Sequence, residues 1–127
     1  MARILIVDDE VHVIGALRRL LRREGFTIEA ALNGEEALQK LATFQADVVI
    51  SDFRMRGMSG LELLGKVLDR APTTVRVLIS GHADLSSSSG QPGGVISHFI
   101  SKPWDDARLV ADVRALLGSK GSAPPGP

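Results

Sequence analysis

The sequence predicts an α/β fold in which a doubly wound, five-stranded parallel sheet is covered by helices on both faces. Short β-branched runs without polar interruption recur along the chain, a pattern typical of parallel strands buried on both sides. Amphipathic segments at helical spacing alternate with these runs, which favours right-handed crossovers between parallel strands. The 127 residues are 44% hydrophobic and 24% charged, so they suffice for one domain with a substantial core.

The first half of the chain contains three predicted strands and two predicted helices. The strands comprise residues 4–7, 26–32 and 48–50. Between the first two, apolar residues at helical spacing with arginines on the other faces predict an amphipathic helix that ends at Gly25. Asn33 followed by Glu36 resembles a capping box and predicts the start of a second helix.

The second half of the chain continues the alternation of strands and helices, but the helix signal is weak at one position. Strands are predicted at 75–79 and 96–100, and helices from about residue 61 to 70 and from 105 to 117. The helix position between the last two strands, around 84–94, is rich in serine, glycine and proline. Because glycine and proline both disfavour helix, we expect a degraded or disordered fourth helix there.

The boundaries and strand order follow from this pattern. We expect the folded domain to cover 1–117 and the Gly/Ser/Pro-rich residues 118–127 to form a flexible tail or linker stub. A doubly wound sheet of this size suggests a flavodoxin-like fold with strand order 2-1-3-4-5. Ligand sites in such sheets lie beyond the carboxyl ends of the strands, so the polar residues at those ends are the candidates for function.

Composition excludes several classes of function. Fifteen basic and fifteen acidic side chains cancel, so the overall charge favours neither nucleic acid nor an anionic membrane. There is no cysteine, hence no disulfide and no thiolate metal site, which suits a reducing compartment. The apolar run near the start is too short for a signal peptide or a membrane span, so we expect a cytoplasmic protein.

Polar residues end four of the five predicted strands. Asp8 and Asp9 follow the first strand, Asp52 the third, Ser80 the fourth and Lys102 the fifth. These ends meet at one sheet edge, where three carboxylates would repel one another unless a cation lay among them, and Mg²⁺ prefers such oxygen ligands. A carboxylate beside a metal can attack phosphorus and form an acyl phosphate, while a lysine and a hydroxyl bind the phosphoryl oxygens.

This set of residues, with Pro103 after the lysine, resembles the receiver domains of bacterial two-component response regulators over about residues 2–117. The resemblance implies a phosphoacceptor signalling switch in which Asp52 accepts a phosphoryl group from the phosphohistidine of a histidine kinase. It implies no turnover enzyme, only self-phosphorylation and autodephosphorylation. Mg²⁺ would be held directly by Asp9 and Asp52, through water by Asp8, and by the backbone carbonyl of Arg54.

The resemblance also implies switch residues and partners. Phe99 matches the aromatic switch residue that responds when the Ser80 hydroxyl moves to the phosphoryl group, and the Lys102-Pro103 peptide bond is expected to be cis. We hypothesise that Arg54 and His82 flank the phosphoryl group and set its lifetime. The implied partners are a sensor histidine kinase or phosphotransfer protein, and either an output domain or a second copy in a homodimer.

Two departures from the family pattern stand out. The loop after the acceptor usually has proline four residues beyond the aspartate, and Arg56 stands there instead. The fourth helix, normally part of the partner and dimer surface, is replaced by the segment around 84–94 described above. A complete acceptor pocket is therefore expected beside an altered output face.

Three other functions compete with the switch. A flavodoxin-like cofactor binder would need a glycine-rich phosphate loop where Asp8, Asp9 and Glu10 stand. A phosphohydrolase with an aspartate nucleophile of the haloacid dehalogenase class would need an Asp-x-Asp pattern, which is absent around Asp52. A receiver scaffold used only for protein contacts would have no need of all five pocket residues.

Overall fold

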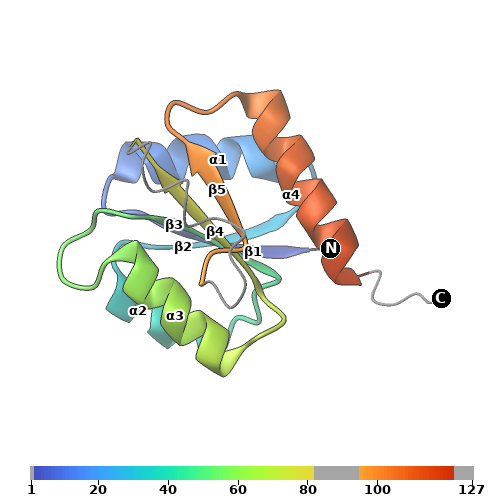
Figure 1. The fold of residues 1–127 in the computed structure, drawn as a ribbon. Coiled ribbons are helices and arrows are strands. Elements are labelled where there is room, and N and C mark those ends of the chain that lie inside the picture. Colours follow the sequence, from blue (N-terminus) through green and yellow to red (C-terminus); the bar gives the residue numbers. More distant parts are fainter. Residues whose placement is uncertain (1, 82–94, 122–127) are drawn as a thin grey trace.

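The computed structural model describes residues 2–81 and 95–121, and its five strands form one parallel sheet (Figure 1). The strands are β1 (Arg3–Val7), β2 (Thr27–Ala31), β3 (Val48–Asp52), β4 (Val75–Ser80) and β5 (His98–Ser101). Their order is β2-β1-β3-β4-β5, and every neighbouring pair is parallel. The doubly wound topology predicted from the sequence is confirmed.

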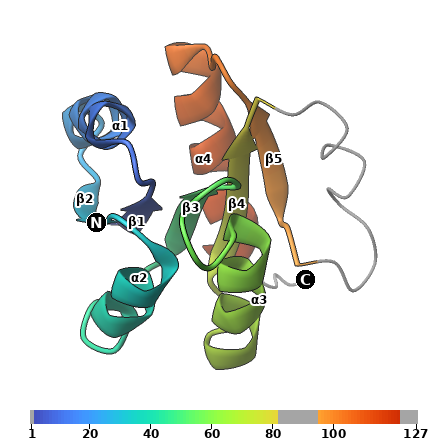
Figure 2. The same ribbon diagram turned by 90° about the vertical axis from the view of Figure 1, so that its left-hand side faces the viewer.

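Helices cover both faces of this sheet. They are α1 (Val11–Arg23), α2 (Gly34–Leu41), α3 (Gly60–Arg70) and α4 (Asp106–Gly121). Figure 2 shows α1 and α4 on one face of the sheet and α2 and α3 on the other. No helix in the described part of the chain is long and apolar enough to cross a bilayer.

Most boundaries differ from the prediction by one or two residues, and the end of the last helix differs by four. The last helix continues to Gly121 rather than ending at residue 117, because the next proline in the chain is Pro124 and nothing before it forbids helical geometry. Strand β5 begins at His98, two residues late, because Ser97 is held differently: its hydroxyl accepts a hydrogen bond from the backbone of Arg76. The expectation for 84–94 lies outside the described residues.

Side-chain caps fix where two helices begin. At α2, Asn33 accepts a hydrogen bond from the Glu36 backbone at 2.8 Å, whereas the Glu36 carboxylate accepts from Leu32 N–H at 2.7 Å instead of completing the box with Asn33. At α3, Ser59 and Glu62 form a reciprocal capping box. Helix α3 therefore starts at a defined residue directly after the loop that follows Asp52.

The core lies in two layers, one on each side of the sheet. Alternate residues of β1 and β3 face opposite layers, so both strands are buried on both sides. The layer under α1 and α4 includes Ile4, Ile6, Leu17, Leu21, Leu109 and Val113. The layer under α2 and α3 includes Leu5, Val7, Ala37, Leu63, Leu64 and Val67. The central strands are thus rigid supports for the residues at their carboxyl ends.

Candidate functional site

The predicted strand-end residues do meet at one edge of the sheet. Asp52 and Ser80 are the last residues of β3 and β4, and Lys102 directly follows β5. A cavity of about 390 Å³ at this edge is lined by Asp9, Glu10, Asp52, Arg54, Ser80, Gly81 and Lys102. Asp8 does not line the cavity, since its side chain is almost completely buried behind it.

Three carboxylates form a cluster at this edge. One oxygen from each of Asp8, Asp9 and Asp52 lies within 4.8 Å of the other two. Asp8 and Asp52 are buried, whereas Asp9 is exposed, so water can reach the cluster from the Asp9 side. Only oxygen donors are offered, and this donor set, open to water, fits Mg²⁺ better than a soft transition metal.

Lys102 is the counter-charge to this cluster. Its Nζ donates a hydrogen bond to Oδ1 of Asp52 at 2.8 Å and a longer one to Oδ2 of Asp8 at 3.5 Å. Burial would lower the pKa of Lys102, but the hydrogen bond to Asp52 and the charges of both aspartates outweigh it and raise the pKa above its usual value. One lysine faces three carboxylates, so the cluster keeps a formal excess of two negative charges.

The pKa of Asp8 shows the cost of that excess. Burial raises it most, and the charge of Asp52 raises it further. A hydrogen bond from the Glu10 backbone N–H, at 2.8 Å to Oδ1, and the neighbouring Lys102 lower it, but the net shift is upward. Ionised Asp8 is therefore under-compensated, which is the environment in which an added cation binds favourably.

The backbone around Lys102 ties β5 to the acceptor edge. Its N–H donates to the carbonyl of Ser80 at 2.9 Å, which extends the pairing of β4 with β5 by one residue. The Lys102-Pro103 peptide bond is cis, the isomer expected from the family resemblance. Trp104 follows, packs against the core layer under α4, and donates from its indole N–H to Asp106 at 3.0 Å.

The loop between Asp52 and α3 is pinned at a residue that the sequence analysis did not single out. Gly60 donates from its N–H to the carbonyl of Phe53 at 2.9 Å. A Cβ atom at Gly60 would collide with the backbone oxygen of Asp52 and crowd Leu78. Glycine followed by a helix, with the Ser59 and Glu62 capping pair around it, was the signal that could have identified this position.

Ser80, Phe99 and Arg54 lie at or near the acceptor edge of the sheet. Ser80 is buried at the cavity, and Phe99, opposite Leu78 in β5, is half-buried and packs against the layer under α2 and α3. Arg54 lines the cavity and is exposed. His82 lies outside the described residues, so its pairing with Arg54 stays a prediction.

Comparisons with known proteins agree with this geometry. The family model of the response regulator receiver domain matches residues 4–114. The hydrogenase transcriptional regulatory protein HoxA of Cupriavidus necator is 36% identical over 121 residues, which cover 94% of this chain and 25% of that protein. The DNA-binding transcriptional regulator NtrC of Escherichia coli is 36% identical over 114 residues, covering 88% of this chain and 24% of that protein.

Solved structures of receiver domains are also similar to this chain. The signal receiver domain of an HD domain-containing protein from Pseudomonas fluorescens superposes with a TM-score of 0.87 at 32% identity, covering 95% of this chain and 98% of that one. The response regulator TrrA from Thermotoga maritima, solved in complex with Mg²⁺-BeF, superposes with a TM-score of 0.82 at 33% identity, covering 91% and 99%.

The chain spans about a quarter to about half the length of the first curated relatives that it matches. The matched segments cover 87% to 94% of this chain, and so most of the folded unit described above. Because the family match covers nearly all of that unit, the chain belongs to the response regulator receiver domain family of two-component systems.

Proposed function

We propose that Asp52 accepts a phosphoryl group from the phosphohistidine of a histidine kinase or phosphotransfer protein, in the presence of Mg²⁺. Family membership supports a role as a signalling switch rather than a turnover enzyme. The observation that carries the finer proposal is the contact between Asp52 and Lys102, at 2.8 Å beside two further carboxylates. A strand-end aspartate without a role in binding would not need a half-buried lysine and an acidic cluster around it.

The chemistry needs little of the protein beyond positioning. An oxygen of the Asp52 carboxylate attacks phosphorus, a new P–O bond forms, and the P–N bond to the donor histidine breaks with its electron pair returning to the imidazole. Lys102 orients the carboxylate by binding Oδ1, and its ammonium is positioned to neutralise charge on the incoming phosphoryl oxygens. Ser80 lines the same cavity and offers a hydroxyl to a phosphoryl oxygen.

The metal ligands follow from the acidic cluster. Asp9 and Asp52 would hold Mg²⁺ directly, Asp8 would hold it through water, and the backbone carbonyl of Arg54 would complete the protein ligands. Mg²⁺, when bound, neutralises charge on the transferring phosphoryl group. The complex of TrrA with Mg²⁺-BeF supports this assignment for a relative of the same fold.

The proposed output runs from Ser80 to Phe99. Ser80 is the last residue of β4, and Phe99 lies in the neighbouring strand β5 with its side chain half-buried. Further proposals are cytoplasmic location, autodephosphorylation timed by Arg54 and His82, and an output domain or homodimer as the receiver of the signal. HoxA and NtrC are transcriptional regulators about four times as long as the segment that matches this chain, which supports an attached output domain.

The test is phosphorylation with acetyl phosphate and Mg²⁺, followed by intact mass measurement. We expect a mass gain of one phosphoryl group that is lost in Asp52→Asn and when Mg²⁺ is chelated. Asp69→Asn is the matched control, because Asp69 is an exposed aspartate on α3. A mass gain that persists in Asp52→Asn, or that needs no divalent cation, would overturn the proposal.

The lifetime proposal needs a separate measurement. Phosphorylated protein is freed of donor, and the decay of the mass gain is followed in the wild type, in Arg54→Ala, in His82→Ala and in the double variant. We expect the double substitution to change the decay rate because Arg54 lines the cavity that water must enter. Equal decay rates in all four proteins would contradict it.

A further inference from the structure

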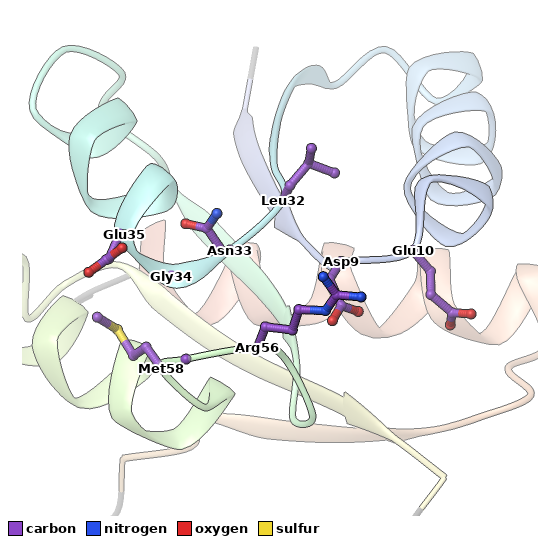
Figure 3. A pocket seen from close by; sticks show the side chains of 9 residues that line it. Asp9, Glu10, Leu32, Asn33, Gly34, Glu35, Arg56 and Met58 are labelled. Carbon is purple, nitrogen blue, oxygen red and sulfur yellow. The ribbon is translucent and has the colours of Figure 1, made fainter.

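A second cavity, larger than the acceptor cavity, lies next to it and shares a wall with it. Its volume is about 690 Å³, and Asp9 and Glu10 line both cavities. The remaining lining residues come from the start of α2 and from the loop that precedes α3, and Figure 3 shows them around the opening. Asp9, the exposed member of the acidic cluster, therefore has the acceptor pocket on one side and this second cavity on the other.

Arg56 is the basic residue among those that line this second cavity. It stands where the family usually has proline, on the loop after the acceptor. Its side chain is exposed and has no hydrogen bond or ion pair with any other described residue. In Figure 3 it extends from the loop toward Asp9, whereas Glu35 lies at the far side of the opening.

We propose that Arg56 lowers the affinity of the receiver for Mg²⁺ by holding a positive charge beside Asp9. This inference rests on the proposed function, which places Mg²⁺ at Asp8, Asp9 and Asp52. A guanidinium and a divalent cation repel each other, and both are attracted to the same exposed carboxylate. Because Arg56 has no fixed partner among the described residues, its charge stays available for this competition.

Electrostatics sets the direction and the size of the effect. Arg56 and Asp9 line the same cavity, and charges act on one another over roughly 10 Å at about 0.1 M salt. Removing one unit of positive charge at such a range from a divalent cation is expected to tighten Mg²⁺ binding by about threefold to tenfold at low ionic strength. Added monovalent salt should shrink the difference.

The experiment is a Mg²⁺ titration by isothermal calorimetry on the unphosphorylated protein. The variants are Arg56→Gln, which removes the charge, Arg56→Lys, which keeps it, and Arg70→Gln, which removes an exposed arginine at the far end of α3. We expect Arg56→Gln alone to bind Mg²⁺ more tightly, and its advantage over the wild type to fall as NaCl is raised. A change caused by altered loop shape would appear in Arg56→Lys as well and would not depend on salt.

Each outcome has a definite meaning. Equal dissociation constants for the wild type and Arg56→Gln would overturn this inference, and so would an equal gain in Arg70→Gln or Arg56→Lys. A wild-type protein that binds no Mg²⁺ at all would overturn the proposed function itself. The two failures are therefore distinguishable in one series of titrations.

Discussion

Replacing Lys102 with methionine tests the electrostatic description of the pocket most directly. Lys102→Met keeps the length of the side chain but removes the charge that faces Asp52 at 2.8 Å and Asp8 at 3.5 Å. Each contact is worth about 5 to 6 kcal/mol of attraction at an effective dielectric constant near 20, before desolvation of the ammonium is set against it. The net loss must be much smaller than this sum.

Two considerations limit how far Lys102→Met lowers the free energy of unfolding. Removing one partner of a buried ion pair destabilises proteins by about 3 to 5 kcal/mol, and about a quarter of the Lys102 side chain is exposed, which reduces the figure. The carboxylates can also take up a proton, which at pH 7 costs about 4 kcal/mol for a group with an ordinary pKa. We therefore expect the free energy of unfolding at pH 7 without Mg²⁺ to fall by about 2 to 4 kcal/mol.

The assay is urea unfolding followed by circular dichroism, at several pH values and with or without Mg²⁺. The pKa of Lys102 is raised in the folded state, so its stabilisation is fully present below the unfolded value of 10.5 and is lost as the pH rises through the folded value. The difference in free energy of unfolding between the wild type and Lys102→Met should therefore shrink in that alkaline range. It should shrink again in acid, where Asp8 binds a proton. Mg²⁺ should also reduce the deficit by supplying the missing charge.

Lys66→Met is the matched control, because Lys66 is an exposed lysine on α3 and its loss should change stability by no more than about 0.5 kcal/mol. The reasoning is refuted if Lys102→Met is as stable as the wild type at pH 7 without Mg²⁺. It is also refuted if the deficit stays constant from neutral pH to the acid transition.

Further predictions concern the same edge of the sheet. Without Mg²⁺, Asp8→Asn should raise the free energy of unfolding at pH 7, because the pKa of Asp8 is raised in the folded state and its charge therefore destabilises the fold above that pKa. Urea melts at a series of pH values should show this gain in stability vanish toward pH 3.8. Gly60→Ala should destabilise by more than 1 kcal/mol, since the new Cβ meets the backbone of Asp52, and the same melts would show it; an unchanged midpoint would contradict the geometry. Ser59→Ala should lose about 1 kcal/mol through the lost cap of α3 while Mg²⁺ affinity by calorimetry stays unchanged.

The sheet was predictable from the sequence because its central strands are buried on both faces. Runs such as 4–7 and 48–50 have no polar residue to interrupt them, and an aspartate follows each run within two residues. Once the order of a doubly wound sheet is assumed, the convergence of Asp8, Asp52 and Lys102 follows from topology alone. Their distances then confirm that they meet, although their chemical roles stay predictions.

Other features depend on contacts that no local pattern contains. Arg76 lies within β4, yet its guanidinium donates to backbone carbonyls of Val95 and Thr74 and so ties the approach to β5 to the end of the preceding loop. Burial lowers the pKa of the Arg76 guanidinium. The residues next to Arg76 in the sequence give no sign of which backbone carbonyls it will contact. The packing of Gly60 was not predictable for the same reason, because its closeness to the backbone of Asp52 exists only in the folded chain.

The division of Lys102 between two aspartates also bears on the order of events in the proposed reaction. Its ammonium cannot serve Asp8 and a phosphoryl group on Asp52 equally well, since one positive charge is shared. A divalent cation among the carboxylates would supply the positive charge that buried Asp8 lacks, and the demand of Asp8 on Lys102 would fall. Metal binding would then prepare the lysine for the phosphoryl oxygens. Two further lysines would neutralise the excess of two negative charges without metal, and the electrostatic attraction of the pocket for a divalent cation would be lost.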